Sequence, residues 1–278
     1  MSNYTELSAV ALRRRVLWIR VLTIVGFIAA WEFAGRSGFF FEGVIPSTWV
    51  VANAVVQELM SAGFYKDLGL TLSASVAGFF VGSLIAILMG IVLGLQPFLR
   101  NVFEPFINAI GGTPKIIFLP IMFLIFGLGI ESKIAKAGLS AFFPVVLSTA
   151  SSFVQIPKIY LLTGRSFNLS PWQMITKLYL PAMADPVLTS LRFAMAMAII
   201  GVLAAEISYS NGGLGYRLMR FSDKYEMGFV YADAILIFLV TALVNYLFTI
   251  GQDIGAMWKR SRAMLTGRQA KVATVPGA

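Results

Sequence analysis

Six long apolar runs constrain this chain more than any other feature. A helix needs about 20 mostly apolar residues to cross the roughly 30 Å hydrocarbon core of a bilayer. Of the 278 residues, 58% are hydrophobic and only 13% are charged, which is far from the composition of a soluble domain. The runs cover roughly 17–35, 70–95, 116–129 with help from the residues before it, 134–153, 187–205 and 231–257. The sequence therefore predicts an all-α polytopic membrane protein with about six transmembrane helices.

The distribution of lysine and arginine predicts the orientation, because short cytoplasmic loops are enriched in these residues. Three arginines at positions 13–15 precede the first run, and basic residues cluster again in 259–271 after the last one. We therefore expect both termini to be cytoplasmic. This orientation places Lys133 and Lys136 in an outer loop, and it places the connection between the fourth and fifth runs inside.

That inner connection is a long segment of mixed polarity, 157–186. It predicts two short amphipathic helices joined by a tight turn, one over roughly 158–167 and the other over roughly 171–179. The second helix is expected to stop near Pro181, because proline interrupts helical hydrogen bonding. A stiff helical hairpin at the inner surface of a membrane protein is a shape that another protein can bind.

Four residues predict the turn of this hairpin. Asn168 follows the first helix, and asparagine often replaces glycine where a helix closes in the left-handed conformation. Ser170 is expected to cap the second helix, with Pro171 in the first helical position. Gln173 stands three residues after Ser170, as a capping box requires.

Several kinds of chemistry have no sequence signature here. No Gly-x-x-x-x-Gly-Lys-Ser/Thr phosphate loop occurs, so the chain is not itself a P-loop ATPase. There is no cysteine or histidine, so the usual ligands of zinc and haem are missing and no metal site is expected. The net charge of +9 is explained by membrane orientation, and we expect no nucleic acid partner. No catalytic residue and no cofactor bound by this chain are expected.

Ionisable residues within the apolar runs are few. Glu206 lies near the outer end of the fifth run and Asp233 near the outer entrance of the sixth, where we expect interfacial water to solvate both. Proton-coupled carriers usually place carboxylates, lysines or histidines in mid-span as relays. The pattern argues against ion coupling as the energy source and favours a motor supplied by another chain.

Small residues form a stripe along the second run. Gly78, Gly82, Ala86, Gly90 and Gly94 recur every four residues, so they share one helix face. Such a face lets another helix approach closely. We expect packing within this chain, with the lining of a ligand pathway as the alternative.

The third run is the least regular. It contains Pro105, Pro114 and Pro120 and the pair of glycines at 111–112. Proline removes a backbone donor and clashes one turn back, so the helix must be broken or kinked. Freed backbone groups survive at membrane depth only where protein or a watery cavity satisfies them. We therefore expect this span in the bundle interior or along a pathway.

Four short stretches carry a family resemblance. They are LSPWQ at 169–173, the TP and LP pairs within 113–120, FGLG at 126–129 and GGLGY at 212–216. With them, residues 65–260 resemble the transmembrane permease subunits of binding-protein-dependent ABC importers, nearest to the nitrate, sulfonate, taurine and bicarbonate branch. The resemblance implies the type I importer permease fold and a multi-pass protein of the bacterial inner membrane.

The family motif lies in the predicted hairpin. It reads Glu-Ala-Ala, three residues, Gly, nine residues, Ile, one residue, Leu-Pro. Leu178 and the Leu-Pro pair at 180–181 match its end, and Asn168 stands at the glycine position. The Glu-Ala-Ala triplet falls on residues 162–164, which read Leu-Thr-Gly and do not match.

In that family this loop forms coupling helices that bind in a groove of the ATPase subunit. The resemblance therefore implies P-loop ATPase subunits that hold ATP and Mg²⁺, an extracytoplasmic solute-binding protein and a permease homodimer as partners. The apolar face of the hairpin is too large to remain exposed to water, so we expect another surface to cover it. Docking to the ATPase would do so, and packing on the chain's own spans is the alternative. The residues assigned to coupling are Leu161, Leu162, Phe167, Asn168, Ser170, Pro171, Trp172, Gln173, Ile175 and Pro181.

The branch that the sequence resembles handles small anions. A pathway for an anion offers hydrogen-bond donors and cations instead of carboxylates. Lys115 and Arg192 are expected at the inner mouth, although Lys115 also suits a snorkelling role, and each serine or threonine also suits an interhelical hydrogen bond. The pathway candidates are Ser75, Thr113, Pro114, Lys115, Pro120, Ser148 and Arg192.

The expected organisation has four parts. A cytoplasmic tail (1–15) precedes the first transmembrane helix and an external connection (16–64), in which Ser47 is expected to cap a short helix ending near residue 62. A permease core of five transmembrane helices (65–260) contains the hairpin at 157–181, and a disordered cytoplasmic tail (261–278) follows.

Two other functions stay open at this point. A secondary carrier or channel working without an ATPase would show paired intramembrane carboxylates or an inverted repeat. A membrane-embedded enzyme would need converging catalytic groups. Neither pattern is visible in the sequence.

Overall fold

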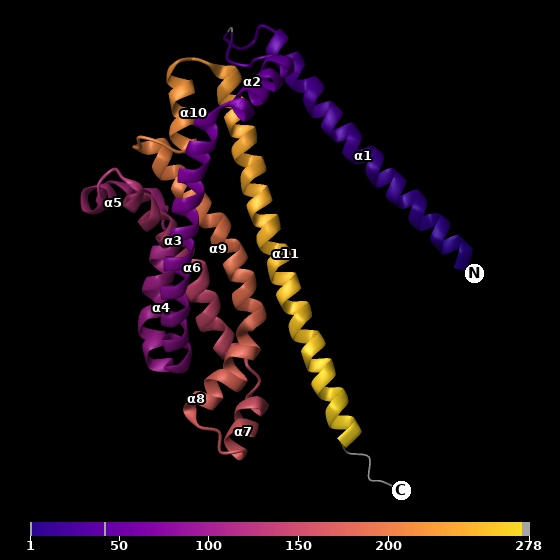
Figure 1. Ribbon diagram of the computed structural model, residues 1–278, viewed down its shortest axis with the longest axis vertical. Coiled ribbons are helices and arrows are strands. Elements are labelled where there is room, and N and C mark those ends of the chain that lie inside the picture. Colours follow the sequence, from indigo (N-terminus) through magenta and orange to yellow (C-terminus); the bar gives the residue numbers. More distant parts are fainter. Residues whose placement is uncertain (1, 42, 274–278) are drawn as a thin grey trace. The chain divides into compact units, whose positions relative to one another are not determined.

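All the regular secondary structure that is described in this protein is helical. The computed structural model describes the backbone of residues 2–41 and 43–273, and the side chains of residues 12, 14–41 and 43–252. No strand occurs in these ranges, which confirms the all-α fold. The elements, drawn in Figure 1, are α1 (Ser2–Arg36), α2 (Thr48–Met60), α3 (Ala62–Leu95), α4 (Pro97–Gly112), a 3₁₀ helix η1 (Lys115–Phe118), α5 (Leu119–Phe126), α6 (Ile130–Gln155), α7 (Lys158–Ser166), α8 (Pro171–Met174), a π-helical turn η2 (Ile175–Tyr179), α9 (Leu180–Ser208), α10 (Leu214–Asp223) and α11 (Met227–Ala273).

Within the described residues, five helices are long and apolar enough to cross a membrane. They lie in α1, α3, α6, the continuous stretch from α8 to α9, and α11. A sixth span is formed when α4 and η1–α5, which meet at an angle of 94°, are counted as one broken span. The six predicted spans are thus recovered.

The ends of the chain are more helical than expected. The helix of α1 begins at Ser2, within the segment expected to be a cytoplasmic tail, and α11 remains helical as far as Ala273, where a disordered tail was expected. Residues 274–278 of the predicted tail lie outside the described part. The short helix expected after Ser47 is confirmed as α2, with Ser47 as its N-cap.

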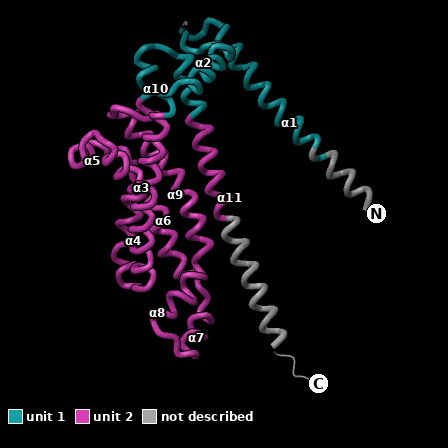
Figure 2. Tube along the Cα trace, viewed as in Figure 1, with its two compact units in different colours: residues 1–65, 217–236 teal, residues 66–216, 237–278 magenta. Residues whose placement is uncertain are grey.

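The chain divides into two compact units (Figure 2). One unit comprises residues 1–65 and 217–236, and the other comprises residues 66–216 and 237–278. The second unit contains the broken span, the hairpin and most of the membrane-length helices, and it is the unit that carries the candidate sites.

Polar contacts between distant segments hold the first unit together. Trp31 Nε1 donates to the carbonyl of Pro46 at 3.0 Å. The Glu32 carboxylate accepts from both the backbone N–H and the hydroxyl of Thr48, at 3.1 Å each. These bonds attach the end of α1 to the start of α2.

A buried ion cluster joins the other elements of this unit. Arg217 Nε donates to the Glu58 carboxylate at 2.6 Å and lies 3.6 Å from the Asp233 carboxylate. Asp233 is completely buried, so the prediction that water solvates it is wrong. The positive charge of Arg217, in place of water, stabilises the buried carboxylate.

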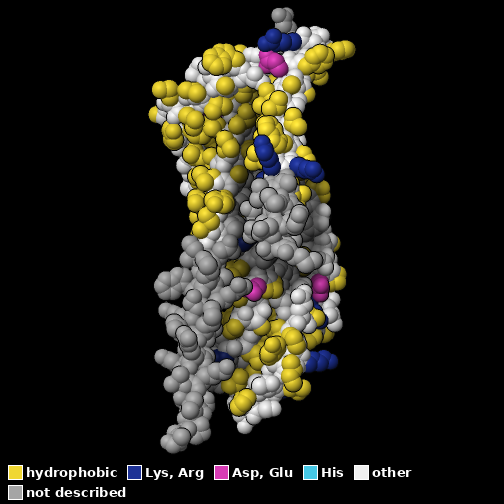
Figure 3. All heavy atoms as spheres, turned by 90° about the vertical axis from the view of Figure 1, so that its right-hand side faces the viewer, with side chains coloured by type: hydrophobic (Ala, Val, Ile, Leu, Met, Phe, Trp, Pro, Cys, Tyr) yellow, Lys and Arg dark blue, Asp and Glu magenta, His cyan; other side chains and the backbone are white. Residues whose placement is uncertain are grey.

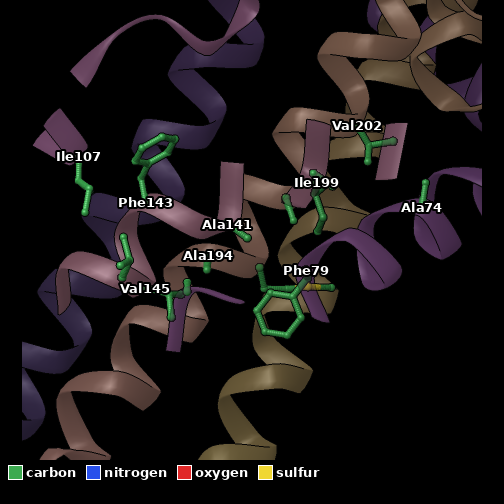
Figure 4. Packing of buried hydrophobic residues seen from close by; sticks show 14 of the residues in the cluster. Ala74, Phe79, Ile107, Ala141, Phe143, Val145, Ala194, Ile199 and Val202 are labelled. Atoms are coloured by element: carbon green, nitrogen blue, oxygen red, sulfur yellow. The ribbon is translucent and has the colours of Figure 1, made fainter. Parts of the chain in front are cut away.

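The core of the second unit is built around α6. Of the five single-helix spans in the described chain, α6 is the most enclosed, with 61% of its apolar window buried against 17% for α11. Its small residues, such as Ala141, meet those of α9, such as Ala194 (Figure 4). Phe79 of α3 and Ile107 of α4 complete the same cluster. The polar residues of α6 are therefore enclosed by its neighbours in this unit.

The small-residue stripe of α3 packs on α6, as predicted for contact within the chain. A Cβ on Gly78 would lie 2.9 Å from the backbone nitrogen of Gly138, and one on Gly94 would lie 2.9 Å from Cβ of Phe153. The contact nearer the start of α3 is made with a residue nearer the start of α6, and the later contact with a later residue. The two helices therefore run parallel, and the last residues of both lie at the same end of the unit.

The opposite face of α3 is apolar and exposed. Phe80, Leu84 and Leu88 are each more than half exposed, and their spacing of four residues places them on one side of the helix. Hydrophobic side chains likewise cover much of the surface shown in Figure 3. This is the pattern expected for helices that face lipid.

The broken span is confirmed, but its predicted interior position is wrong for a single chain. In α4 and α5 only Ile107 and Leu119 are buried, and both helices lie at the edge of their unit in Figure 1. The freed backbone groups are satisfied locally instead. The Thr113 hydroxyl donates to the Ala109 carbonyl at 2.9 Å, and the ammonium of Lys115 donates to the Gly111 carbonyl at 2.8 Å.

Candidate coupling hairpin and transport pathway

The turn of the hairpin has the predicted geometry. Asn168 adopts a positive φ of 49° after α7. The N–H of Leu169 bonds to the Gly164 carbonyl at 3.1 Å and that of Asn168 to the Arg165 carbonyl at 2.9 Å, the two bonds of a Schellman motif. The first arm therefore ends where the sequence predicts.

The second arm begins with the predicted capping box. The Ser170 hydroxyl accepts from the N–H of Gln173 at 3.3 Å, and the Gln173 amide oxygen accepts from the N–H of Ser170 at 3.0 Å. Pro171 occupies the first turn of α8. Reciprocal capping fixes the angle at which the chain turns back.

The predicted end of the second arm near Pro181 is wrong. After α8 the chain makes a single π turn, in which the N–H of Leu180 bonds to the carbonyl of Ile175, and α9 then continues without a gap. Pro181 lies in the first turn of α9. The wider turn takes up the missing proline donor, so the hairpin and the fifth span form one continuous helical rod.

The two arms close on a glycine. Gly164 is the only buried residue of α7, and a Cβ there would lie 2.5 Å from Sδ of Met174 and 3.3 Å from Cδ1 of Leu178. This glycine stands at the second alanine position of the family triplet. A small residue there has a clear role, because it lets the arms touch.

The apolar face of the hairpin points away from the protein's own spans. Leu162, Phe167 and Trp172 are 57%, 76% and 71% exposed. Leu161 and Ile175 are half-buried. The first three side chains are thus left uncovered by this chain, while the last two also pack internally.

A cleft of about 620 Å³ lies beside the hairpin. It is lined by the end of α6, including Gln155, by Tyr160 of α7, and by Lys177 and Pro181 of the second arm. The hairpin therefore leaves a hollow between its base and the spans from which it projects.

The structure brings only some pathway candidates together. Thr113, Pro114, Lys115 and Pro120 all flank the break between α4 and α5. The break follows 16 residues of helix, about 24 Å of rise from the α3–α4 turn. Because that turn lies at the hairpin end of the unit, the prediction that Lys115 sits at the inner mouth is wrong.

The other candidates lie apart and make ordinary internal bonds. The Ser75 hydroxyl donates to the Thr71 carbonyl at 2.7 Å within α3. Ser148 bridges α6 to the Pro186 carbonyl of α9 at 3.2 Å. Arg192 donates to the side-chain oxygen of Gln252 at 3.2 Å. These three do not form one site.

Sequence reasoning missed a buried polar network in α6. Lys133 and Lys136, expected in an outer loop, are 5% and 3% exposed. Lys133 pairs with Glu206 of α9 at 3.2 Å and donates to the Gly212 carbonyl at 2.5 Å. Glu206, expected to be solvated, is 1% exposed. The sequence did contain a signal for this network: Lys133, Lys136 and Ser140 follow Gly129 at intervals of three or four residues, so the three polar residues share one helix face.

Glu206 also fixes the Gly-Gly-Leu-Gly-Tyr segment. Its carboxylate accepts from the Thr71 hydroxyl at 2.9 Å and from the N–H of Gly215 at 3.0 Å. The Thr71 oxygen in turn accepts from the N–H of Leu214 at 2.9 Å. The segment is thus attached to α3, α6 and α9, and its close approach to Glu206 explains its glycines.

Comparison with known proteins identifies the family. The sequence matches the family described as "Binding-protein-dependent transport system inner membrane component" over residues 78–256. It is 30% identical to the nitrate import permease protein NrtB of Synechococcus elongatus, over 66% of each chain. It is 27% identical to the taurine transport system permease protein TauC of Escherichia coli, over 70% of each chain.

The fold has a solved counterpart. A chain of the MetNI methionine ABC transporter superposes with a TM-score of 0.58 at 16% identity, covering 74% of this chain and 94% of the other. This likeness confirms the expected importer permease fold. Since the family match also covers more than half of the sequence, the chain belongs to the inner membrane components of binding-protein-dependent transport systems.

Proposed function

We propose that this chain is the transmembrane permease subunit of an ATP-driven importer for a small anion. The family match supports the transport role, and the relatives named for nitrate and taurine support an anionic group on the substrate. The observation that carries the coupling role is the uncovered apolar face of a rigid hairpin at one end of the bundle.

The hairpin suits docking to an ATPase subunit for two reasons. Its turn is fixed by the Schellman motif and the capping box, so little conformational freedom is lost on binding. Its most exposed large side chains are Phe167 and Trp172, and tryptophan is enriched among the residues that dominate interface energies. The partner ATPase would bind ATP and Mg²⁺, and its conformational change would be transmitted to this chain through the hairpin.

A second copy of this chain is the partner best suited to cover the broken span. In α4 and α5, Phe98, Phe106, Leu124 and Ile125 are each more than 60% exposed. Irregular backbone at membrane depth is not left facing lipid, so a protein surface is required there. A homodimer would place the two breaks face to face along a shared pathway, with a solute-binding protein at the outer side and both termini in the cytoplasm of a bacterial cell.

Replacing Trp172 by glutamate tests the coupling role. The charge would enter the apolar interface, and losing such an anchor costs about 2 kcal/mol or more, roughly thirtyfold in affinity. We expect co-purification with the ATPase subunit and ATP-driven uptake of labelled nitrate or taurine into proteoliposomes to fall together, while membrane insertion is unchanged.

Tyr225→Glu is the matched control, because Tyr225 is 83% exposed and lies outside the hairpin. ATPase co-purification should match that of the unmodified protein. Normal ATPase binding and uptake by Trp172→Glu would remove the hairpin from the mechanism. Gradient-driven uptake by the chain alone would instead establish a secondary carrier or channel.

A further inference from the structure

Two lysines from different elements lie beside the break between α4 and α5. Lys136 lies on α6 and is 3% exposed, and Lys115 lies on η1 and is half-buried. Lys115 Nζ lies over the ring of Phe143, and Lys136, Ser140 and Phe143 follow at helical spacing on one face of α6. Lys136 Nζ lies 3.5 Å from the hydroxyl of Ser140, one turn further along α6. Two cations and a hydroxyl thus lie along one face of α6.

Within the described part of the chain, no carboxylate balances these two lysines. Among the described residues, neither lysine has a carboxylate within the 4.0 Å of an ion pair, and the nearby Glu206 is already paired with Lys133. An ammonium has three N–H donors. Lys115 gives one to the Gly111 carbonyl, and Lys136 reaches only Ser140, at the limit of a hydrogen bond. Most donors are therefore unused.

The surroundings favour a balancing anion. The Lys115 ammonium lies 5.3 Å from the centre of the Phe143 ring, and Phe143 itself is buried. α9 closes the other side, where a Cβ on Gly201 would lie 2.6 Å from the Ser140 hydroxyl. A charge taken out of water in such apolar surroundings is unfavourable unless a partner of opposite sign compensates it.

We propose that Lys115, Lys136 and Ser140 form a binding site for a small oxyanion, such as a nitrate or a sulfonate group, within the first half of α6. The proposal rests on the proposed function and assigns the substrate a site in this chain. A planar or tetrahedral oxyanion has several acceptor oxygens, which match donors that converge from η1 and α6.

The depth of the site suits a transport step. Lys136 is the seventh residue of α6, about 9 Å of rise from the start of that helix. The break beside Lys115 is about 24 Å of rise from the hairpin end. An oxyanion bound here is away from both ends. Because the site has only two cations and one hydroxyl, it also allows the release that conduction requires.

The test is an anion titration of the full chain in lipid nanodiscs. Sodium nitrate and sodium ethanesulfonate are the probes, with ionic strength held constant by sodium gluconate, and thermal unfolding is followed by tryptophan fluorescence. A ligand that binds only the folded protein raises its unfolding temperature with concentration. We expect both Lys136→Met and Lys115→Met to need about tenfold more anion for the same stabilisation.

Lys66→Met is the matched control, because Lys66 is exposed in the same unit, and it should titrate like the unmodified chain. Ser140→Ala keeps both charges and provides a second variant in case a methionine variant fails to fold. We expect it to need about threefold more anion for the same stabilisation. The proposal is overturned when neither anion stabilises the unmodified chain, or when Lys136→Met titrates as that chain does.

The same titration separates the site from the transport role. The Trp172→Glu variant should bind the anions normally, because Trp172 lies on the hairpin. Anion stabilisation without ATP-driven uptake by the unmodified complex would leave the site standing and remove the proposed function. Uptake without anion stabilisation would leave the proposed function standing and remove the site.

Discussion

A single methyl group added at Gly82 should force α3 and α6 apart. A Cβ on Gly82 would lie 2.7 Å from Cα and 2.8 Å from the carbonyl carbon of Gly138, and closer still to its carbonyl oxygen. All three atoms belong to the backbone, so no side-chain rotation relieves the overlap. The helices themselves must move in the Gly82→Ala variant.

The size of the effect follows from this distance. Ordinary contacts of a Cβ begin at 3.4 Å, and the nearest atom is the Gly138 carbonyl oxygen. The helices must therefore separate by about 1 Å, and such a gap loses about half of the dispersion energy across it. Within a bilayer no hydrophobic force between helices compensates. Overpacking typically costs about 1–3 kcal/mol, and alanine regains about 1 kcal/mol of helix propensity. We expect a net loss of up to about 2 kcal/mol in the free energy of unfolding.

Gly69→Ala is the matched control in the same helix. Nothing lies within 4 Å of a Cβ at Gly69, so this variant should gain up to about 1 kcal/mol. Both free energies are measured by equilibrium unfolding in mixed dodecylmaltoside and dodecylsulfate micelles, followed by circular dichroism. If Gly82→Ala were as stable as Gly69→Ala, the close backbone contact between α3 and α6 would be refuted.

Three further variants test other parts of the structure. Ser170→Ala removes the capping box and should cost about 1 kcal/mol, seen as roughly fivefold faster hydrogen exchange of the Gln173 amide; unchanged exchange would contradict the cap. Lys133→Met leaves Glu206 buried without its cation and should destabilise the chain by about 3–5 kcal/mol, whereas adding Glu206→Gln should restore part of that stability in the same unfolding assay. Arg217→Met should likewise cost about 3–5 kcal/mol, because its two buried carboxylate partners lose their counter-charge, and a loss below 1 kcal/mol would show that water replaces it.

Local signals in the sequence predicted local structure well. The left-handed Asn168, the Ser170 capping box and the short helix after Ser47 depend on residues within one or two turns of each other. The glycine stripe of α3 was also sufficient, because a smooth helix face has few other uses in a membrane. The number of spans followed from the lengths of the apolar runs.

Long-range pairing could not be predicted in the same way. Hydropathy places charged residues at the ends of spans, so Lys133, Lys136 and Glu206 were taken as solvated, whereas the packing of α3, α6 and α9 buries all three. Pro181 was taken as a helix end, because a sequence pattern does not show that a π turn will take up its missing donor. The polar sites of this protein are set by which helices meet, and that information is spread over the whole chain.

The unexpected continuity of α8, η2 and α9 strengthens the proposed mechanism. A hairpin joined to the spans by flexible loops would absorb a push from an ATPase, whereas here one arm continues directly into α9 and the other follows α6 closely. These are the two helices that enclose the proposed oxyanion site: α6 supplies Lys136 and Ser140, and α9 presents Gly201 to the Ser140 hydroxyl. Gly201 lies about 32 Å of helical rise beyond the start of α9. Since the α6–α9 contact at Ser140 is too close for even one added methyl group, a shift of the hairpin that moves one helix against the other would change the space around the lysines. Such a shift would link the proposed docking at Trp172 to the release of an anion.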